Sequence, residues 1–190
     1  MRTKEHHCEN FSGKLLVAMP HIKPHNFAKT LIYVYSHGES GTEGIILNRA
    51  SVQFRFEDLL VHAGIAVQPM RSPRLHYGGP VDTDRGFVLH SSDYLSEESV
   101  LVGENLAVTR TVDVLRMIAT RSIPKNYWIS VGRTHWPARQ LRKEIQENKW
   151  LCIEPTLDLI FSEDLETKWV RAFSILDTIP AQFSNLCGHA

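Results

Sequence analysis

Short apolar runs, separated by polar and glycine-containing segments, mark the first part of the chain. Residues 15–19 form a continuous apolar run that a proline ends, which is typical of a strand buried on both faces. Residues 30–36 are β-branched and aromatic, and residues 44–48 form another apolar run. Between them, residues 37–42 carry turn-forming glycine and serine. The pattern predicts a first strand and then a β-hairpin made by the second and third apolar runs.

The hydrophobic spacing then changes to that of a helix. Phe56, Leu59 and Leu60 share one face if residues 56–62 are helical, and Gly64 follows as a terminating residue. The spacing therefore predicts a short helix after the hairpin.

Strands and a longer helix are predicted for the middle of the chain. Residues 86–90 form an apolar run that ends in a histidine, and an acidic, serine-rich loop follows. Residues 106–109 and 127–131 are predicted as strands, the second closed by Gly132, with an amphipathic helix over residues 111–121 between them. This order favours a parallel crossover unit.

The last third of the chain is predicted to be mainly helical. Pro137 suits the first turn of a helix that runs to about Asn148, and residues 150–154 form a strand. Ser162 is a suitable N-cap for a final helix. The apolar stripe of that helix would be Leu165, Trp169, Phe173 and Leu176.

Composition indicates an ordinary soluble globular protein. The 190 residues are 43% hydrophobic, and 21 basic side chains balance 21 acidic ones, so no global field attracts nucleic acid or an anionic membrane. The charges are unevenly placed, because residues 82–104 are mainly acidic and residues 110–149 mainly basic. We expect one domain over residues 1–190, with residues 1–12 as a flexible arm.

The three cysteines and the N-terminus indicate a location. Cys8, Cys152 and Cys187 are far apart and form no Cys-x-x-Cys pair, which argues against a disulfide framework or a zinc ribbon. We find neither a signal-peptide core nor an apolar run long enough to span a membrane. We therefore expect a cytoplasmic protein without a membrane partner.

Residues 77–91 contain the densest group of candidate functional side chains. Glycines and a proline bend the chain, two carboxylates and an arginine follow, and an apolar run ends on a histidine. Backbone N–H groups at such a glycine turn can hold an anion. The alternative is a shaped turn that leads into a strand. The candidate binding residues here are Gly78, Gly79, Pro80, Asp82, Asp84, Arg85 and His90.

The chemistry of this group stays open between site and scaffold. Asp82 and Asp84 are spaced as at the start of a calcium loop, but position six of that loop would be Phe87 instead of glycine and position twelve Asp93 instead of glutamate. A magnesium or manganese site, or caps on backbone N–H groups with an arginine pairing nearby, remain alternatives. His90 could be a general base or a hydrogen-bonded structural residue. With no complete signature, we expect no cofactor, no metal and no catalytic residue.

Two further sets of residues are candidates. Asn48 and Arg49 end the hairpin, where they could bind a carboxylate or phosphate, or hold a turn and a structural salt bridge. Arg139, Arg142 and Lys143 could contact nucleic-acid phosphates, although the helix that carries them also fits an ordinary amphipathic helix with tryptophans in the core.

Several segments together resemble the YqgE/AlgH family across nearly the whole chain. The resemblance implies a bacterial cytoplasmic α+β protein with a bent, bifurcated mixed β-sheet that forms a pseudo-barrel surrounded by helices. It implies no established reaction, and some members are labelled transcriptional regulators. The segments are Gly13–Pro20, Gly44–Arg49, Gly78–Val81, Arg85–His90, Trp136 with Gln140, Leu141, Glu144 and Ile145, Trp150, and Gly188–Ala190.

These observations favour a non-enzymatic regulatory protein that binds an unknown protein or small-molecule partner. We expect its contact surface at residues 78–85 together with Asn48 and Arg49. Direct DNA binding through the basic segment 110–149 is the first alternative. A metal-dependent or hydrolytic enzyme is the second.

Overall fold

The structure is a computed structural model that describes residues 10–23, 26–66, 72–110, 112–121 and 124–175. Within these residues the chain forms nine strands and five helices. In chain order they are β1 (Leu15–Ala18), β2 (Leu31–Gly38), β3 (Gly41–Ile46), α1 (Phe56–His62), β4 (Leu75–Tyr77), β5 (Val81–Ser91), β6 (Val100–Val102), β7 (Leu106–Thr109), α2 (Val112–Arg121), β8 (Tyr127–Trp136), α3 (Gln140–Gln146), β9 (Trp150–Ile153), α4 (Leu157–Phe161) and α5 (Lys168–Ser174).

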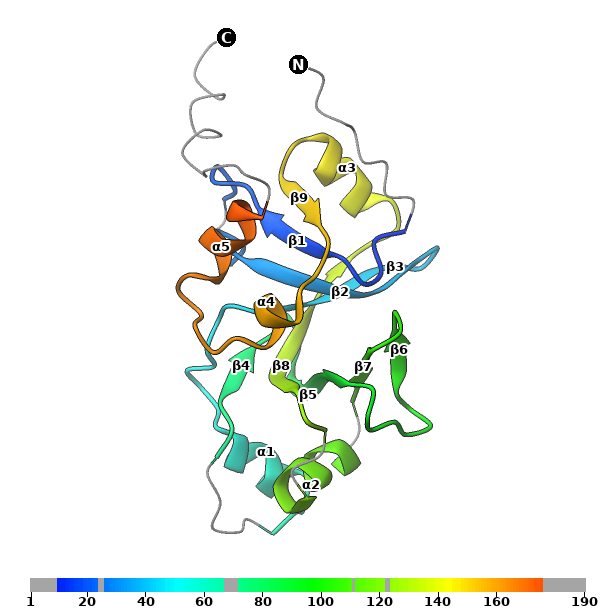
Figure 1. Cartoon of the computed structure of the whole chain (residues 1–190), viewed down its shortest axis with the longest axis vertical. Coiled ribbons are helices and arrows are strands. Elements are labelled where there is room, and N and C mark those ends of the chain that lie inside the picture. The colour runs from blue at the N-terminus through cyan, green and yellow to red at the C-terminus, as the bar shows by residue number, and fades with distance from the viewer. Residues whose placement is uncertain (1–9, 24–25, 67–71, 111, 122–123, 176–190) are drawn as a thin grey trace.

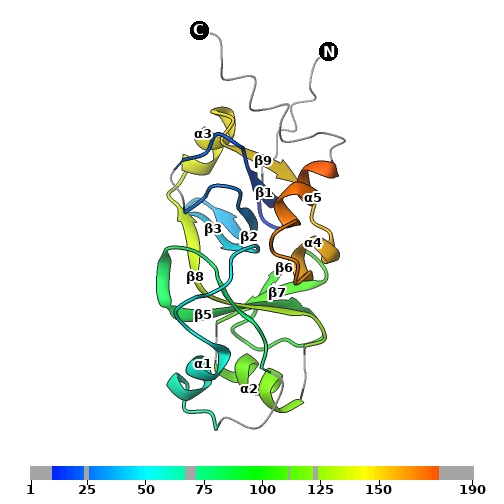
Figure 2. The same cartoon turned by 90° about the vertical axis from the view of Figure 1, so that its left-hand side faces the viewer.

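One curled sheet organises the molecule, with the strand order β6-β7-β5-β8-β3-β2-β1-β9. Neighbours on this path are antiparallel, and β4 pairs with β8 in parallel. Strand β8 joins the two halves of the sheet, and α1 and α2 lie at the end opposite α3 (Figures 1 and 2). The expected α+β class, with a bent mixed sheet that forms a half-barrel and helices around it, is confirmed.

The bend in the sheet lies at Gly132, in the middle of β8. The residues before it pair with β4 and β5, and residues 134–136 pair with β3. Gly132 has a φ of 75°, a conformation that side-chain-bearing residues seldom adopt. The sequence prediction that Gly132 closes the strand is therefore wrong, because the glycine redirects β8 and lets it continue into the second half of the sheet.

Strand β5 lies between two apolar cores. Phe87 and Leu89 of β5 belong to the larger core, which also contains β1, β2, α4 and α5. Val88, between them, points to the smaller core with Phe56 of α1 and Ile118 of α2. Because side chains alternate across a strand, β5 contributes to both cores, and its apolar run has no polar face.

The hairpin and the first helix are confirmed. Strands β2 and β3 pair over the predicted region, and α1 has the predicted bounds, 56–62. Strands β7 and β8 flank β5, and both run antiparallel to it, so they are parallel to each other. The segment that contains α2 thus connects the parallel strands β7 and β8 as a crossover, and β5 lies between these two strands.

The sequence reading was wrong at several element boundaries. Strand β5 begins at Val81 instead of residue 86, and strands β4 and β6 were not expected. Helix α3 begins at Gln140, after Arg139 in a left-handed conformation, instead of at Pro137. Each difference depends on strand pairing or local backbone geometry, which the spacing of apolar residues does not specify.

The C-terminal helices also differ from the prediction. Ser162 follows the short, unexpected helix α4 as its C-cap and does not start the last helix, which begins at Lys168. Trp169 and Phe173 are buried as expected, whereas Leu176 lies outside the described residues.

At the N-terminus, Phe11 is 3% exposed and packs into the larger core, so a flexible arm does not extend to this residue. Residues 1–9 lie outside the described part of the chain. Among the described helices, none is long and apolar enough to cross a membrane.

Candidate functional site

Strand β5 contains a large β-bulge between Val81 and Gly86, within the stretch 77–91 that holds most candidate side chains. Val81 pairs with Arg133 and Gly86 with Val131, so five steps along β5 stand against two along β8. The extra residues leave the plane of the sheet, and Asp82 takes a φ of 52°, which aspartate tolerates better than most residues. The tight turn expected at residues 78–85 is thus a turn followed by a bulged strand.

Backbone contacts explain the glycines of this stretch. A Cβ at Gly78 would lie 2.2 Å from Gly132 O, and a Cβ at Gly79 would lie 2.3 Å from Arg133 O. Gly78 also donates its N–H to Val131 O at 2.8 Å. These glycines therefore let the chain cross β8 at close range, and the Gly78 N–H is already used within the fold. Pro80 follows them as an exposed residue.

Arg133 of β8 holds the start of the bulge. Its Nε donates to Asp82 Oδ2 and its NH1 to Glu43 Oε1, both at 2.8 Å. The other oxygen of Glu43 accepts a 2.7 Å hydrogen bond from the Tyr35 hydroxyl. The sequence prediction paired Arg85 with a nearby carboxylate and gave Asp82 or Asp84 backbone N–H donors, but the partner of Asp82 is Arg133.

The electrostatics of this network agree with an ion pair. The hydrogen bond from Arg133 lowers the pKa of Asp82 below its ordinary value. Burial would lower the pKa of Arg133, but the hydrogen bond to Asp82 and the charge of Glu43 raise it. Burial, and then the hydrogen bond to Glu43, raises the pKa of Tyr35. Asp82 and Arg133 therefore stay charged at neutral pH and the Tyr35 hydroxyl stays protonated, as expected for a structural clamp.

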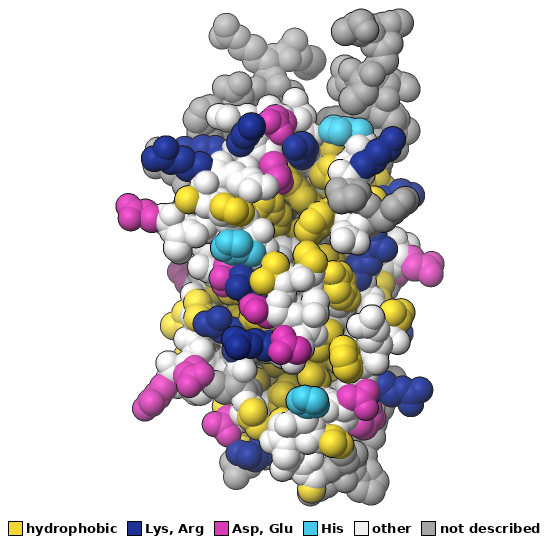
Figure 3. Space-filling view, turned by 180° about the vertical axis from the view of Figure 1, so that it is seen from behind, with side chains coloured by type: hydrophobic (Ala, Val, Ile, Leu, Met, Phe, Trp, Pro, Cys, Tyr) yellow, Lys and Arg dark blue, Asp and Glu magenta, His cyan; other side chains and the backbone are white. Residues whose placement is uncertain are grey.

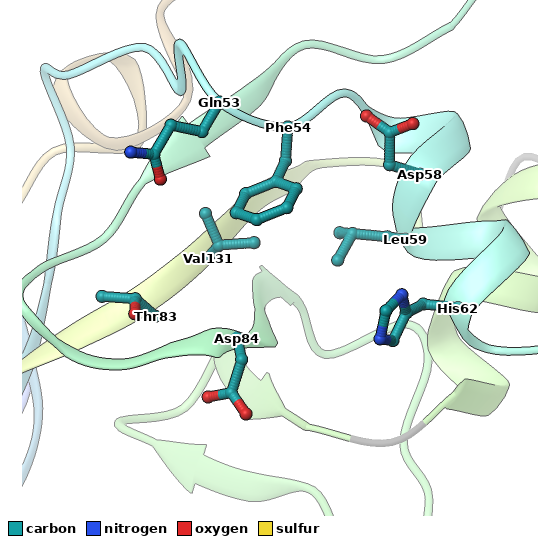
Figure 4. A pocket seen from close by; sticks show the side chains of 8 residues that line it. All are labelled: Gln53, Phe54, Asp58, Leu59, His62, Thr83, Asp84 and Val131. Atoms are coloured by element: carbon teal, nitrogen blue, oxygen red, sulfur yellow. The ribbon is translucent and has the colours of Figure 1, made fainter.

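A pocket opens where the bulge faces α1. Its volume is about 380 Å³. Figure 4 shows the Phe54 ring, Leu59 and His62 directed toward one hollow, with Val131 of β8 behind them and β5 on the other side. The pocket is thus apolar inside and polar at its rim. The residues that line it are Gln53, Phe54, Asp58, Leu59, His62, Thr83, Asp84 and Val131.

The two aspartates that line the pocket differ in their hydrogen bonding. Asp58 Oδ2 accepts a hydrogen bond from the backbone N–H of Arg55 at 2.7 Å, which caps helix α1. Asp84 is exposed on the bulge, and its side chain has no hydrogen-bond or ion-pair partner among the described residues. Asp84 is therefore the candidate from the sequence that lines the pocket, and Figure 4 shows its carboxylate directed away from the Phe54 ring.

Three exposed apolar side chains belong to the segments that carry the pocket residues. Val52 is 95% exposed, Val61 is 68% exposed and Phe54 is 42% exposed. Val52 and Phe54 lie in the segment just before α1, and Val61 lies on α1 itself. Of these three, Phe54 lines the pocket, and an exposed aromatic side chain in a pocket is typical of binding surfaces.

The other candidates from residues 77–91 lie outside the pocket lining. Arg85 is exposed next to Asp84. His90 is fully buried near the far end of β5, where Nδ1 bonds Ser91 O at 2.9 Å and Nε2 bonds Thr109 Oγ1 at 2.8 Å. Burial lowers the pKa of His90, so the ring is neutral and acts as a structural hydrogen-bonding group. Asp82, Asp84 and His90 thus do not meet in one place.

Asn48 and Arg49 contact the backbone of the preceding loop. Asn48 accepts from Leu31 N and donates to Lys29 O, and Arg49 NH2 donates to Ala28 O at 2.8 Å. Both bonds of the Asn48 amide hold this turn in place, which is the structural alternative considered for it. Within the described residues, no group of three His, Cys, Asp or Glu side chains is placed to hold a metal ion.

The basic candidates lie at the opposite end of the molecule, on α3 and its N-cap. Arg139, Arg142 and Lys143 are all exposed, and Lys143 is 3.8 Å from Glu147 in an i,i+4 pair. Strand β8, and not a helix, precedes α3, so a helix-turn-helix is absent here. On the face shown in Figure 3, basic and acidic side chains are interspersed.

A carboxylate anchors α3 to the core. Glu144 Oε2 accepts from the indole N–H groups of Trp136 and Trp150, at 2.9 and 2.8 Å, and Oε1 accepts from Gln140 at 3.0 Å. Both tryptophans are buried, as expected for core residues. These residues of the family pattern therefore stabilise the fold.

Sequence reasoning missed a buried lysine. Lys168 is fully buried, and its Nζ donates to Leu47 O and Ile160 O and lies 3.7 Å from the centre of the Trp128 ring. His76 stacks on the same ring at 3.5 Å, and two groups this close to one ring centre must lie on opposite faces. Burial lowers the pKa of Lys168 to about 7 and that of His76 to about 3. Nothing in the spacing of Lys168 distinguishes it from a surface lysine.

The pocket residues Gln53, Phe54, Asp58 and His62 were also missed. Phe54 alone carried a signal, since it is an aromatic residue just before a helix and outside the apolar stripe of that helix.

The curled sheet, the β5 bulge and the surrounding helices define an α+β half-barrel protein, and comparisons with known proteins place it further. Residues 15–180 match the family DUF179, described as AlgH-like. A UPF0301 protein of Rhodopseudomonas palustris is 39% identical over 187 residues, which cover 94% of this chain and 86% of that protein. A UPF0301 protein of Rhizobium meliloti is also 39% identical, over 94% of this chain and 92% of its own length. The chain belongs to the AlgH-like family.

Solved structures agree with this assignment. The solution structure of the AlgH protein from Pseudomonas aeruginosa is similar, with a TM-score of 0.78 and 33% identity over 100% of both chains. A crystal structure of a Corynebacterium diphtheriae protein shares the fold, with a TM-score of 0.71 and 17% identity over 88% of this chain and 87% of its own. The biochemical function of the family is not established.

Proposed function

We propose that this protein acts by binding a ligand or partner in a regulatory role and not by catalysing a reaction. The observation that carries the proposal is the pocket between α1 and the β5 bulge, with its mainly apolar interior and the partly exposed Phe54 ring in its lining. A bulge beside a pocket is a common way to present side chains to a ligand. The expected contact surface, residues 78–85 with Asn48 and Arg49, is thereby narrowed in this proposal to Thr83 and Asp84, because Asn48 and Arg49 bind the backbone.

A fragment screen by nuclear magnetic resonance tests this proposal. At least one class of probe should shift the backbone amide resonances of Thr83, Asp84 and Val131 in a saturable way. Phe54→Ala should weaken that binding about tenfold, because it removes the aromatic wall. Phe54 lies outside both apolar cores, so the variant should fold. A screen in which no probe shifts these amides would reject the pocket as a binding site.

Direct DNA binding is the second proposal, supported by the exposure of Arg139, Arg142 and Lys143 on one short helix and its cap. Retention of a duplex should then fall with salt and disappear when these three charges are reversed. Absence of binding even at low salt would remove this proposal. The proposed location is a reducing cytoplasm, supported by the three widely spaced cysteines of the sequence, which form no Cys-x-x-Cys pair.

A further inference from the structure

A second pocket lies between the segments that belong to the two ends of the curled sheet. Strand β6 is at one end of the strand order and β9 at the other. Residues 102–106 of the β6–β7 hairpin line one part of the pocket, and residues 155–157, which follow β9, line another. We call it the seam pocket. Its volume is about 270 Å³. Since a cavity of about 150 Å³ holds benzene, the seam pocket has room for one ring with a short substituent.

The lining of the seam pocket is mainly apolar. Val102, Leu106 and Ile160 line it and also belong to the larger core. Leu157 lines it as well and is 56% exposed. An occupant would therefore contact core side chains and remove the apolar surface of Leu157 from water, which favours binding.

Tyr33 of β2 supplies a polar group to this apolar lining. Its side chain belongs to the larger core and is only 1% exposed, and its hydroxyl has no hydrogen-bond partner among the described residues. The described side-chain atoms that are enclosed without a partner belong to His76, Trp128 and Thr134. The Tyr33 hydroxyl is not among them, so it reaches a surface, and the seam pocket is the hollow that Tyr33 lines. Because a buried tyrosine hydroxyl usually has a partner, an occupant of the pocket is the expected one.

The charges around the seam pocket favour an uncharged occupant. Burial raises the pKa of Tyr33, so its hydroxyl stays protonated and can donate to an acceptor. Among the residues that line the pocket none is lysine, arginine or histidine, so an anion would find no positive side chain. Glu104 is the charged residue of the lining and is exposed, and a pair with such a carboxylate would contribute little to the binding of a cation.

We propose that the seam pocket binds a small uncharged molecule with an apolar body and a carbonyl oxygen that accepts a hydrogen bond from the Tyr33 hydroxyl. This is a second site, independent of the pocket between α1 and the β5 bulge. The apolar lining provides most of the contact area, and the single hydroxyl fixes the orientation of the occupant.

The test uses probes that share one ring and differ in a single group. Acetophenone carries a carbonyl, and α-methylstyrene has nearly the same shape with a methylene in place of the oxygen. Benzoate and benzamidine carry a negative and a positive group. Binding to the whole protein is followed by the backbone amide resonances of Val102, Leu106 and Ile160. We expect saturable shifts with acetophenone, with a dissociation constant on the order of millimolar for so small a molecule. Both charged probes should bind at least about tenfold more weakly, because their charges would lose water without a partner.

Tyr33→Phe then tests the hydroxyl. The ring is kept and no described partner is lost, so the variant should fold. The ratio of the affinities for acetophenone and α-methylstyrene should fall at least about threefold, because the hydrogen bond to the carbonyl is lost. A ratio is used because the two probes differ in hydrophobicity. Tyr127→Phe is the matched control, since Tyr127 packs against the smaller core and should keep the wild-type ratio.

Three results would overturn the inference. They are an unchanged ratio in Tyr33→Phe, binding of benzoate or benzamidine as tight as that of acetophenone, and absence of saturable shifts with acetophenone. The last two are measured on the wild-type protein and do not depend on the variant. The amides followed here differ from those of Thr83, Asp84 and Val131, so failure at the seam pocket leaves the proposed function standing, and the reverse also holds.

Discussion

Arg133 is the residue on which the shape of the candidate site depends. It joins Asp82 at the start of the bulge to Glu43 of β3, and its side chain is only 15% exposed. Two strands from different halves of the sheet are thus tied through one guanidinium. This clamp therefore links the start of the bulge to the other half of the sheet.

Replacing Arg133 by methionine should destabilise the protein by about 1–3 kcal/mol, because two partly buried carboxylates lose their partner. Chemical unfolding monitored by circular dichroism would measure the change. Arg85→Met is the matched control, since Arg85 is exposed on the same bulge, and its effect should stay within about 0.5 kcal/mol. Equal effects of the two substitutions would mean that the clamp contributes nothing.

At the scale of elements, the passage of β8 from one half of the sheet to the other depends on Gly132. A Cβ there would lie 2.2 Å from Gly79 O, a distance at which the backbone must move. Gly132→Ala should therefore cost at least about 3 kcal/mol or prevent folding, because strain and overpacking add.

Gly64→Ala provides the comparison for that substitution. Gly64 has a φ of 67°, close to the 75° of Gly132, but a Cβ there would meet nothing within 4 Å. The Gly64→Ala substitution should lower the free energy of unfolding by the backbone strain alone, about 1 kcal/mol. Thermal unfolding of both variants measures the difference, and similar losses would show that close packing at Gly132 is unimportant.

Helix α3 is held by Glu144 more than by its own length. At seven residues the helix is too short to be stable alone, and Glu144 accepts hydrogen bonds from two buried indoles. Glu144→Ala should cost about 2–3 kcal/mol and increase hydrogen exchange of α3 amides. Glu147→Ala removes only surface pairs with Lys143 and Lys149, so a loss above about 1 kcal/mol there would contradict this account.

At the scale of the whole molecule, buried ionisable groups set how stability depends on pH. Lys168 has a folded pKa of about 7 against 10.5 in the unfolded chain, so between these values the unfolded state holds the extra proton. Stability from this group therefore rises with pH over that window, by up to about 1.4 kcal/mol per pH unit. His76, with a folded pKa of about 3 against 6.5, makes stability fall as pH drops from 6.5 toward 3.

The high-pH limit comes from two buried phenols. Burial raises the pKa of both Tyr33 and Tyr35, so above pH 10 the unfolded chain loses protons that the folded state keeps. The free energy of unfolding should then decline.

The buried lysine leads to a prediction at lower pH. We expect a higher free energy of unfolding at pH 9 than at pH 7 in the wild type, measured by urea unfolding. Lys168→Met should lose this increase, and an unchanged increase in the variant would show that another group causes it.

The parts of the fold that follow from local pattern were predictable from the sequence. Helix α1 and the β2–β3 hairpin depend on spacing and turn chemistry within a few residues, and both were found. The site was predictable only in part, since Asp84 was named, but Phe54 and His62 come from another segment and Arg133 lies far along the chain.

The sequence by itself determined the apolar strands, because these depend on local periodicity. It also determined the membership of the AlgH-like family through motifs along nearly the whole chain, and the α+β class followed from that resemblance. Tertiary structure alone decided that Asn48 and His90 are structural, that Gly132 bends β8, and that Asp84 lies beside Phe54 and Val131. The physical reason is that a charged or polar side chain takes its role from the partners around it. Those partners, as with the carbonyls that surround Lys168, are brought together only by folding.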